Sequence, residues 1–522
     1  MSRYLSESFF CRLWVAFYGW LKNGFIGRFI QYLGRTWRSS VSYALLARLL
    51  CGGSAVENSA FFRLGGKINA RLHAMGTGLR RGYEESFYAR CALPYMKKSM
   101  ILRFLFGNGI TGLLLTCAAS YAIIDYLLRD VFQLTNIASI WDEGFMVLCA
   151  LWILVQRMGS EKPARSRGNA VDLFIALYMV AGILLLVNYH KYLPVNVTGF
   201  RASMQYLLMF FLVVRLIRNE GDFMRMYRLM VAIATIIALY GIYQFVVGVE
   251  IPSNWTDAAE GSVRTRVFAI FSNPNVMGGY MILFAPMAIG LAYAQEDLPS
   301  KIFYWCCGLA MCGACLFTMS RGAWLALAVA AILFALIIDR RLFGILVVGG
   351  ILACFLPFVR SRIGYLFTAE FQESNQRGGR GVRWDRTFGY LDYFRAWSTG
   401  LGYGMYGGAV AMQNKVNPLL YYTYVDNYYV KILAENGIAG LSALLTMLSG
   451  LLWNGARSIA ACGKSEYRPL CAGMFVALIG ILVQSFFECL WEEPYLMALY
   501  FIIAAMLVYA GILRKKDNSI EP

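Results

Sequence analysis

Residues 342–358 read LFGILVVGGILACFLPF, and residues 359–378 read VRSRIGYLFTAEFQESNQRG. The first stretch is apolar and close to the ~20 residues that a helix needs to cross a bilayer. The second opens a polar segment that continues to residue 424, where hydrophobic sequence resumes. This segment carries Arg360, Arg362, Arg377, Arg380, Arg383, Arg386 and Arg395 against Glu370, Glu373, Asp385 and Asp392. A polar segment of this length between two membrane helices suits the chemistry of a membrane enzyme, and its excess of arginine predicts an anionic ligand.

The composition of the whole chain predicts a polytopic membrane protein. Of its 522 residues, 59% are hydrophobic and 15% are charged, and the mean hydropathy is +0.54. We expect an all-α protein with about twelve transmembrane helices, and a large extracytoplasmic loop between the ninth and the tenth. The expected spans lie near residues 101–128, 143–157, 171–189, 203–218, 223–248, 275–295, 302–319, 322–338, 342–358, 429–453, 469–490 and 494–513.

The placement of Lys and Arg predicts the orientation, because short cytoplasmic loops are enriched in both. With a cytoplasmic N-terminus, the inner short loops hold Arg157, Lys162, Arg165, Arg167, Arg215, Arg218, Arg225, Arg228, Lys301, Arg340, Arg341, Arg457, Lys464 and Arg468. The outer short loops hold only Arg129, Lys191, Arg201, Arg264, Arg266 and Arg321. We therefore expect a multi-pass protein of the cytoplasmic (inner) membrane with both termini inside and the 359–424 loop outside.

Residues 1–100 differ from the rest, because basic residues recur among the aromatic ones and leave no uninterrupted span. Basic amphipathic helices on the cytoplasmic membrane surface, attracted by anionic lipids, are the expected structure. Nucleic-acid binding competes as an interpretation, but no nucleic-acid motif is present. The expected organisation is this basic region, transmembrane helices one to nine in 101–358, the arginine-rich loop 359–424, helices ten to twelve in 425–513, and a cytoplasmic tail 514–522.

Metal and cofactor chemistry has little support in the sequence. The two histidines, His73 and His190, lie far apart, and most of the thirteen cysteines fall inside expected spans as small packing residues. Cys312 and Cys315 have metal-ligand spacing but lack a second ligand pair. No phosphate-binding glycine loop, nucleophile elbow or paired-histidine zinc motif occurs, and we expect neither metal nor cofactor.

Polar motifs collect on the predicted outer side. Arg264 and Arg266 precede Phe-Ser-Asn-Pro-Asn at residues 271–275, Ser-Arg-Gly at 320–322 fills a tight turn, and Asp426 and Asn427 precede a span. A charge near hydrocarbon usually faces a polar cavity or a partner. We therefore expect Arg321 to point into the helix bundle, although a snorkelling anchor at a helix end is the alternative.

In these motifs the chain resembles the O-antigen ligase and polymerase superfamily of membrane glycosyltransferases. The resemblance has four parts in order: Phe-x-Asn-Pro-Asn, the Ser-Arg-Gly turn, a Gly-x-Arg step beginning a loop helix that ends in Gly-Tyr-Gly at 402–404, and Asp426-Asn427 followed by Glu-Asn-Gly-Ile-Ala-Gly at 435–440. It covers roughly residues 200–510 and leaves out the amphipathic N-terminal region.

The resemblance implies transfer of a glycan from an undecaprenyl diphosphate carrier to an acceptor hydroxyl outside the cytoplasmic membrane, without metal or nucleotide sugar. It implies that Arg321 and Arg383, with Arg386 as the alternate, stabilise the diphosphate leaving group, as guanidinium groups can do by bidentate binding. Family ligases carry a histidine where this chain has Asp426. A carboxylate could take the acceptor's proton in its place, or Asp426 could only cap the following helix.

Further residues are candidates for substrate binding, each with a structural alternative. Tyr424 could stack on a sugar or belong to an interfacial aromatic belt, and Glu435 could pair with Lys431 four residues earlier. Further binding candidates are Arg380, Arg264, Arg266, Asn275 and Asn427. We expect the loop to form short helices that cap an outer cavity.

Two other classes of function compete with a glycosyltransferase. A glycolipid or polysaccharide flippase would have two repeated halves, and none is evident. A scaffold for envelope assembly would not require the outer arginines. Within the glycosyltransferase class, the missing histidine leaves polymerase and ligase open, and the sequence does not identify the sugars or the acceptor.

Overall fold

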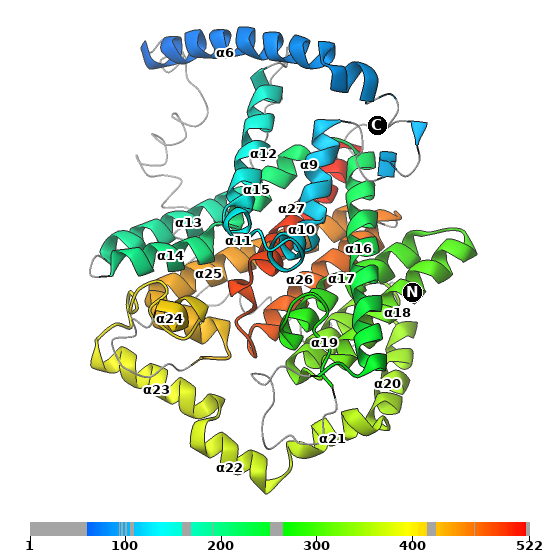
Figure 1. The fold of residues 1–522 in the computed structure, drawn as a ribbon, viewed down its shortest axis with the longest axis vertical. Helices are drawn as coiled ribbons and strands as arrows, with labels where there is room; N and C mark the ends of the chain where they lie inside the picture. The colour runs from blue at the N-terminus through cyan, green and yellow to red at the C-terminus, as the bar shows by residue number, and fades with distance from the viewer. Residues whose placement is uncertain are drawn as a thin grey trace, which may run out of the picture. The chain divides into compact units, whose positions relative to one another are not determined.

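The computed structural model describes residues 60–92, 94, 98–99, 102–104, 109–158, 169–189, 192–250, 265–414, 424–463 and 465–517. Helices make up its regular structure, and no strand occurs within these ranges (Figure 1). Two compact units are present, one of residues 1–82 and 155–163, the other of residues 83–154 and 164–522. Helix α6, Ala60–Glu85, belongs mainly to the first, and the helices that form the site belong to the second.

Eight helical stretches are long and apolar enough to cross a membrane. They are α13 (Ala170–Asn188), α14 with α15 (Leu193–Met204 and Leu207–Leu216), α16 (Glu220–Val247), α17 (Pro274–Ala294), α18 (Leu298–Phe317), α25 (Tyr428–Ala461), α26 (Tyr467–Gln484) and α27 (Pro494–Asp517). The all-α polytopic fold is thereby confirmed.

The number of spans is lower than expected over the described residues. Two helix pairs could each form a broken span: α9 (Ile110–Ala119) with residues 121–131, bent by 73°, and α20 (Arg341–Cys354) with the end of α21 (Pro357–Tyr365), bent by 80°. Counting each pair as one gives up to ten spans. Helices α12 (Trp141–Met158) and α19 (Arg321–Ile337) fall outside this count, so twelve stays a prediction.

Helices α17 and α27 lie deepest, each with 89% of its apolar window buried in protein. Small residues bring α26 against α17: a Cβ on Gly473 would lie 2.6 Å from the Pro286 carbonyl oxygen, and one on Gly290 equally close to that of Pro469. Close backbone approach through small residues is how helices pack where lipid removes the hydrophobic drive between them. These contacts join the C-terminal part of α17 to the N-terminal part of α26, so the two helices run antiparallel. The N-terminal end of α17 therefore lies beside the C-terminal end of α26.

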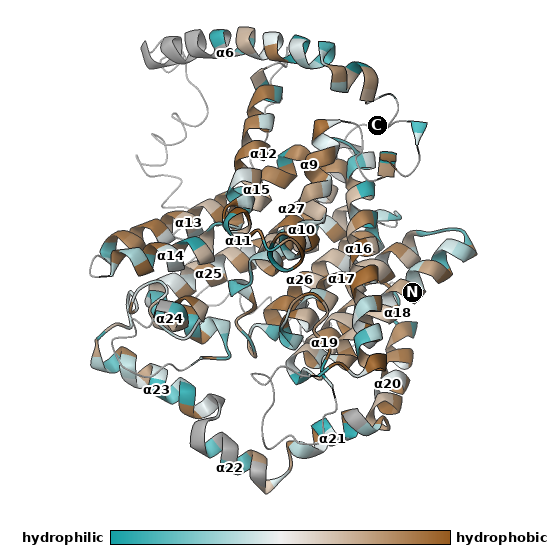
Figure 2. Ribbon diagram, in the orientation of Figure 1, coloured by the Kyte–Doolittle hydropathy of each residue, from teal (hydrophilic) through white to brown (hydrophobic). Residues whose placement is uncertain are grey.

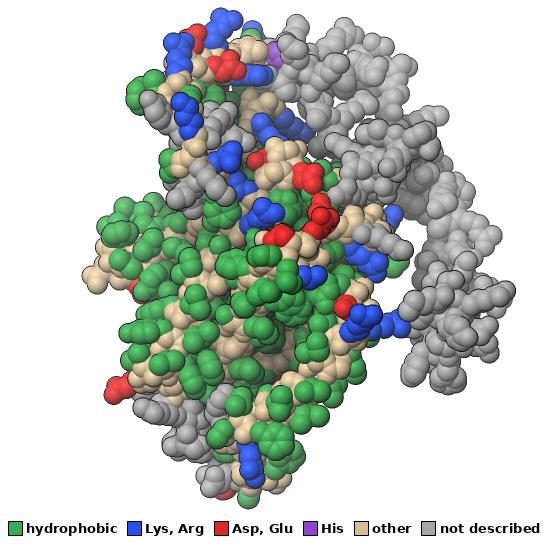
Figure 3. All heavy atoms as spheres, turned by 90° about the vertical axis from the view of Figure 1, so that its right-hand side faces the viewer, with side chains coloured by type: hydrophobic (Ala, Val, Ile, Leu, Met, Phe, Trp, Pro, Cys, Tyr) green, Lys and Arg blue, Asp and Glu red, His purple; other side chains and the backbone are tan. Residues whose placement is uncertain are grey.

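Outer helix faces remain apolar, as contact with lipid requires. Val187 and Val246 are each about three quarters exposed, and Figure 3 shows a face covered mostly by hydrophobic side chains. Figure 2 shows the same apolar character along the long helices and more hydrophilic residues along α21 and α23.

The polar segment after α20 forms short helices, as expected. These are α21, α22 (Ala369–Gly378), α23 (Arg380–Tyr393) and α24 (Ala409–Asn414). Between α23 and α24 the chain docks on a kink in α25, where Gly437 has a φ of 63°. Leu401 N–H donates to Ala434 O at 2.9 Å, and Ile438 N–H donates to Trp397 O at 2.8 Å. These bonds attach the polar segment to the start of α25.

Candidate active site

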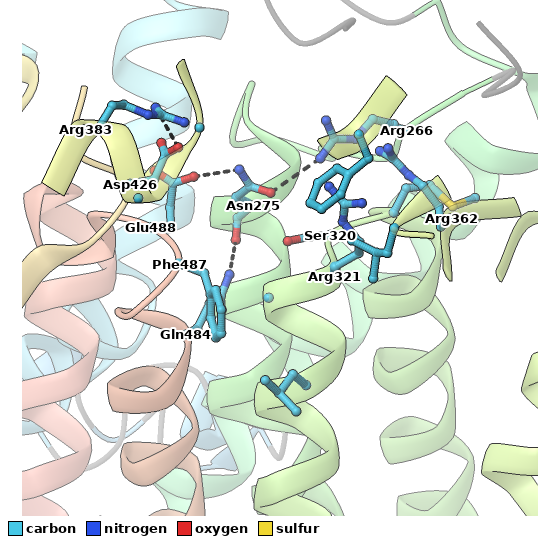
Figure 4. Close-up of a pocket in the computed structure, with 17 residues that line it drawn as sticks. Arg266, Asn275, Ser320, Arg321, Arg362, Arg383, Asp426, Gln484, Phe487 and Glu488 are labelled. Carbon is cyan, nitrogen blue, oxygen red and sulfur yellow. Dashed lines mark hydrogen bonds and ion pairs between the residues drawn. The ribbon is translucent and has the colours of Figure 1, made fainter. Parts of the chain in front are cut away.

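A cavity of about 660 Å³ lies where the polar motifs of the sequence meet. Its walls come from the start of α17, the α18–α19 turn, α21, the α22–α23 junction, the approach to α25 and the end of α26 (Figure 4). The polar lining side chains are Arg266, Asn275, Ser320, Arg321, Arg362, Arg383, Asp426, Gln484 and Glu488.

The Phe-Ser-Asn-Pro-Asn motif builds one wall by starting a helix. Asn273 is the N-cap of α17, its side-chain oxygen accepting from Asn275 N at 2.8 Å, and Pro274 occupies the first turn, where its missing N–H costs nothing. Asn275 then points into the cavity, where Nδ2 donates to Glu488 Oε2 at 2.6 Å and Oδ1 accepts from Arg266 Nη2 at 3.4 Å. Its carbonyl accepts from Gln484 Nε2 at 2.8 Å.

The Ser-Arg-Gly turn places Arg321 at the opposite wall. Ser320 caps α19 by accepting from Ala323 N at 3.4 Å. The Arg321 guanidinium carbon lies 5.9 Å from the ring centre of Tyr365 and 5.6 Å from that of Phe371, distances at which a cation is attracted to an aromatic face. Arg321 therefore points from its helix toward the polar segment, and it lines the cavity.

Two arginines of the polar segment reach the cavity. Arg362 on α21 is only 4% exposed. Arg383 on α23 makes an ion pair with Asp426, Nη1 to Oδ2 at 2.8 Å, and donates from the same nitrogen to Tyr424 O at 3.0 Å. Thr387 and Leu391, one and two turns further along α23, are buried on the same side of the helix.

A second carboxylate, Glu488, lies beside Asp426 just after α26 (Figure 4). It is 7% exposed and accepts hydrogen bonds from Asn275 and from Tyr424 Oη, the latter at 2.7 Å. Burial raises the pKa of Glu488, and the charge of Asp426 adds to this, while the hydrogen bonds from Tyr424 and Asn275 oppose it.

Charges are divided between the two ends of the cavity. Figure 4 shows Arg266, Arg321 and Arg362 at one end, and Asp426, Glu488 and Arg383 at the other, with Asn275 between them. Among the lining residues that the structure describes, four arginines face two carboxylates, a net positive charge. It can hold an anion at the arginine end and a hydrogen-bond donor at the carboxylate end.

The predicted site residues divide into two groups. Five line the cavity: Arg266, Asn275, Arg321, Arg383 and Asp426. Tyr424 stands behind it, bonded to Glu488. Arg264 and the side chain of Arg380 fall outside the described parts of the chain.

Three other candidates lie away from the cavity. Arg386 is exposed on α23. Asn427 is the N-cap of α25, accepting from Tyr429 N at 2.9 Å and Val430 N at 3.1 Å, so the capping role considered for Asp426 belongs to Asn427. Glu435 is fully buried, where it pairs with Lys431 at 2.8 Å. Lys431 also pairs with Glu492 at 3.0 Å.

Two charged lining residues were missed from the sequence, Arg362 and Glu488. Arg362 was one of seven loop arginines with nothing to distinguish it. Glu488 lay inside an expected span, 469–490, and an acidic residue in a span is by itself a signal of a functional site. Within the described ranges, no cluster of three or more His, Cys, Asp or Glu residues is arranged to hold a metal ion.

Residues 306–445 match the family model described as O-antigen ligase. The match contains Arg321, Arg362, Arg383 and Asp426, and it confirms the resemblance to the O-antigen ligase and polymerase superfamily over that segment. It supports a membrane enzyme that transfers glycans. A comparison with curated proteins gives no match.

Proposed function

We propose that this protein moves a glycan from an undecaprenyl diphosphate carrier to an acceptor hydroxyl on the outer side of the cytoplasmic membrane. The observation that carries the proposal is a cavity with guanidinium groups at one end and carboxylates at the other. Glycosyl transfer from a diphosphate needs both, an anion site for the leaving group and an acceptor for the proton of the attacking hydroxyl.

The arginine end suits the diphosphate. As the bond between the anomeric carbon and the phosphate oxygen breaks, negative charge accumulates on the leaving group. Arg321, Arg362 and Arg266 offer fixed, permanently charged donors for those oxygens. Fixed donors stabilise the developing charge without having to reorganise during the reaction. In this proposal the guanidinium groups stabilise the charge of the leaving group.

The acceptor hydroxyl is placed at the carboxylate end. Asp426 stands where the resemblance implies the proton acceptor of ligases, and Arg383 holds its side chain at 2.8 Å. A hydroxyl donating to a carboxylate there is oriented toward the sugar–phosphate bond, and orientation of this kind accounts for much of the advantage of an enzyme site.

The remaining parts of the proposal concern the membrane. We place the chain in the inner membrane with the polar segment 359–424 outside and the termini inside, on the distribution of Lys and Arg. The basic region 1–100 then lies on the cytoplasmic surface against anionic lipids, an arrangement supported by exposed Arg71, Arg80 and Arg81 on α6.

The test is the length of lipid-linked glycans in a deletion strain complemented with wild type, Arg321→Ala or Arg360→Ala. Arg360 lies on α21 and is exposed away from the cavity, so it controls for loss of one positive charge. Each protein's amount in the membrane is measured first. The proposal expects restoration by wild type and Arg360→Ala and failure of Arg321→Ala.

The amounts and lengths of lipid-linked and surface glycans distinguish the possible activities. Single repeat units accumulating on the carrier identify a polymerase, and long chains that fail to reach their acceptor identify a ligase. An unchanged set of lipid-linked and surface glycans in every strain contradicts the proposal and favours transport or scaffolding.

A further inference from the structure

Glu488 accepts three hydrogen bonds and is more deeply buried than Asp426. Asn275 Nδ2 donates to Oε2 at 2.6 Å, Tyr424 Oη donates to Oε1 at 2.7 Å, and the N–H of Cys489 also donates to Oε1, at 3.3 Å. All three are donors to the carboxylate. Oε2 accepts one of these bonds and Oε1 accepts two, and Glu488 lines the cavity.

Asp426 differs from Glu488 in its partner and exposure. Its Oδ2 lies 2.8 Å from Arg383 Nη1, and its side chain is 23% exposed. The guanidinium of Arg383 therefore already occupies one oxygen of the Asp426 carboxylate. Within the part of the chain that the structure describes, no lysine or arginine pairs with Glu488.

We propose that Glu488 is a further catalytic residue of this site, the general base that takes the proton of the acceptor hydroxyl, while Asp426 orients that hydroxyl. The inference rests on the proposed function. The acceptor O–H bond breaks as its oxygen bonds to the anomeric carbon, and the proton goes to Glu488 Oε2. The bond from that carbon to the diphosphate breaks with its electron pair on the phosphate oxygen. Glu488 then returns the proton to solvent through the cavity.

The surroundings of Glu488 agree with this role. The titratable and charged groups around it are Tyr424 and Asp426 from the approach to α25, and Cys489 and Glu493 from its own segment. Arg383 lies at the same end of the cavity, paired with Asp426, and Arg266 lies beyond Asn275 toward the other end. Burial and the neighbouring Asp426 carboxylate raise the pKa of Glu488. A base with a raised pKa binds the acceptor's proton more strongly than an ordinary carboxylate does.

The experiment measures transfer against pH between about 5 and 9 with purified full-length protein in lipid nanodiscs and a lipid-linked oligosaccharide as donor. The variants are Glu488→Gln, Glu488→Asp and Asp426→Asn. Glu466→Gln is the matched control, because Glu466 is an exposed carboxylate at the opposite end of α26 and does not line the cavity. Donor binding and thermal unfolding are measured on every variant.

Loss of a general base lowers turnover typically about 10²- to 10⁴-fold. We expect that loss in Glu488→Gln, with donor KM changed by less than about threefold, since the anion site is intact. Glu488→Asp should retain part of the activity, and the pH range over which its transfer rate rises on the acid side should shift. Asp426→Asn should keep this acid limb of the pH–rate profile where the wild type has it.

Three results bear on the alternatives. If Glu488→Gln or Glu488→Asp keeps wild-type turnover and pH limb while Asp426→Asn removes the limb, Asp426 is the base and the proposal is overturned. A Glu488→Gln protein that unfolds or fails to bind donor, beside a Glu488→Asp protein with an unshifted limb, overturns it in favour of a structural role. If the wild type transfers nothing from the lipid-linked donor, the proposed function itself fails.

Discussion

Arg321 is positioned by three neighbouring features of the fold. Its place at the first position of α19 follows from the Ser320 cap, and the rings of Tyr365 and Phe371 limit the guanidinium to one region of the cavity. A lysine would keep the charge but lose the planar, bidentate donors. We expect Arg321→Lys to lower turnover by about 10²- to 10³-fold, as loss of one preorganised donor typically does, with the folded protein unaffected.

The check is single-turnover transfer with saturating lipid-linked donor, beside Arg360→Lys on the outside of α21. Near-normal transfer by Arg321→Lys would mean that charge alone is used at this position. Equal losses in both variants would point to a general effect of charge on donor capture.

Glu493 supplies a prediction about pH and stability. Burial raises the pKa of Glu493 from its ordinary 4.5 to about 7. The folded state therefore holds a proton that the unfolded state has lost, so this group's contribution to stability is present at low pH and is lost as pH rises through about 7. Glu493→Gln should raise the melting temperature more at pH 8 than at pH 5 in the same detergent. An equal shift at both values would contradict this.

At the level of single residues, the sequence predicted which types of residue form the site better than it predicted which side chains point into the cavity. Residue type and motif identified Arg321, Arg383, Asn275 and Asp426, all of which line the cavity. Helical phase decides which loop arginine points inward, since Arg383 shares the α23 face of buried Thr387, whereas Arg386 is exposed. The inward face of α23 could not be predicted from the sequence, because it depends on where the helix begins and ends.

Helix α25 shows how one residue permits a whole element to dock. Gly437 has φ 63° inside the helix, and a Cβ there would lie 2.5 Å from the carbonyl carbon and oxygen of Ser398. We expect Gly437→Ala to destabilise the fold by about 1–3 kcal/mol, the usual cost of such a backbone in a non-glycine residue, with loss of transfer as the polar segment detaches. Thermal unfolding and transfer should fall together.

The control is Gly389→Ala on α23, where a Cβ would meet no heavy atom within 4 Å. Alanine is favoured over glycine in a helix by roughly 0.5–1 kcal/mol, so this variant should be as stable as the wild type or more so. If Gly437→Ala matched it, the kink in α25 would not depend on glycine.

Hydropathy predicted the elements well where they are straight and less well where they break. The expected spans 275–295 and 302–319 agree closely with α17 and α18. The expected span 469–490 ran past the end of α26 at Gln484, because Phe486, Phe487 and Leu490 are apolar although the chain there is no longer α-helical. Glu488 was therefore assigned to the span. Hydropathy averaged over a window of residues cannot separate a membrane span from an apolar turn that follows it.

The orientation of the whole molecule is open to a direct measurement. Tyr393, 79% exposed at the end of α23, belongs to the segment that we place outside, and Glu296, exposed between α17 and α18, belongs to a loop that we place inside. In intact cells, a membrane-impermeant maleimide should label Tyr393→Cys above the parent's background and label Glu296→Cys only after permeabilisation. The reverse pattern would invert the topology and contradict an extracytoplasmic site.

Helix α20 has consequences beyond its own packing. Val348, Ile351 and Leu352 on it are all more than half exposed. Helix α21, which continues from it after a sharp bend, carries Arg362 into the cavity. With so little protein against α20, the surrounding lipid determines its tilt, and tilt responds to the thickness of the hydrocarbon layer. Under the proposed function the bilayer is thereby a structural component of the proposed anion site, and acyl-chain length is expected to change how far Arg362 reaches into the cavity.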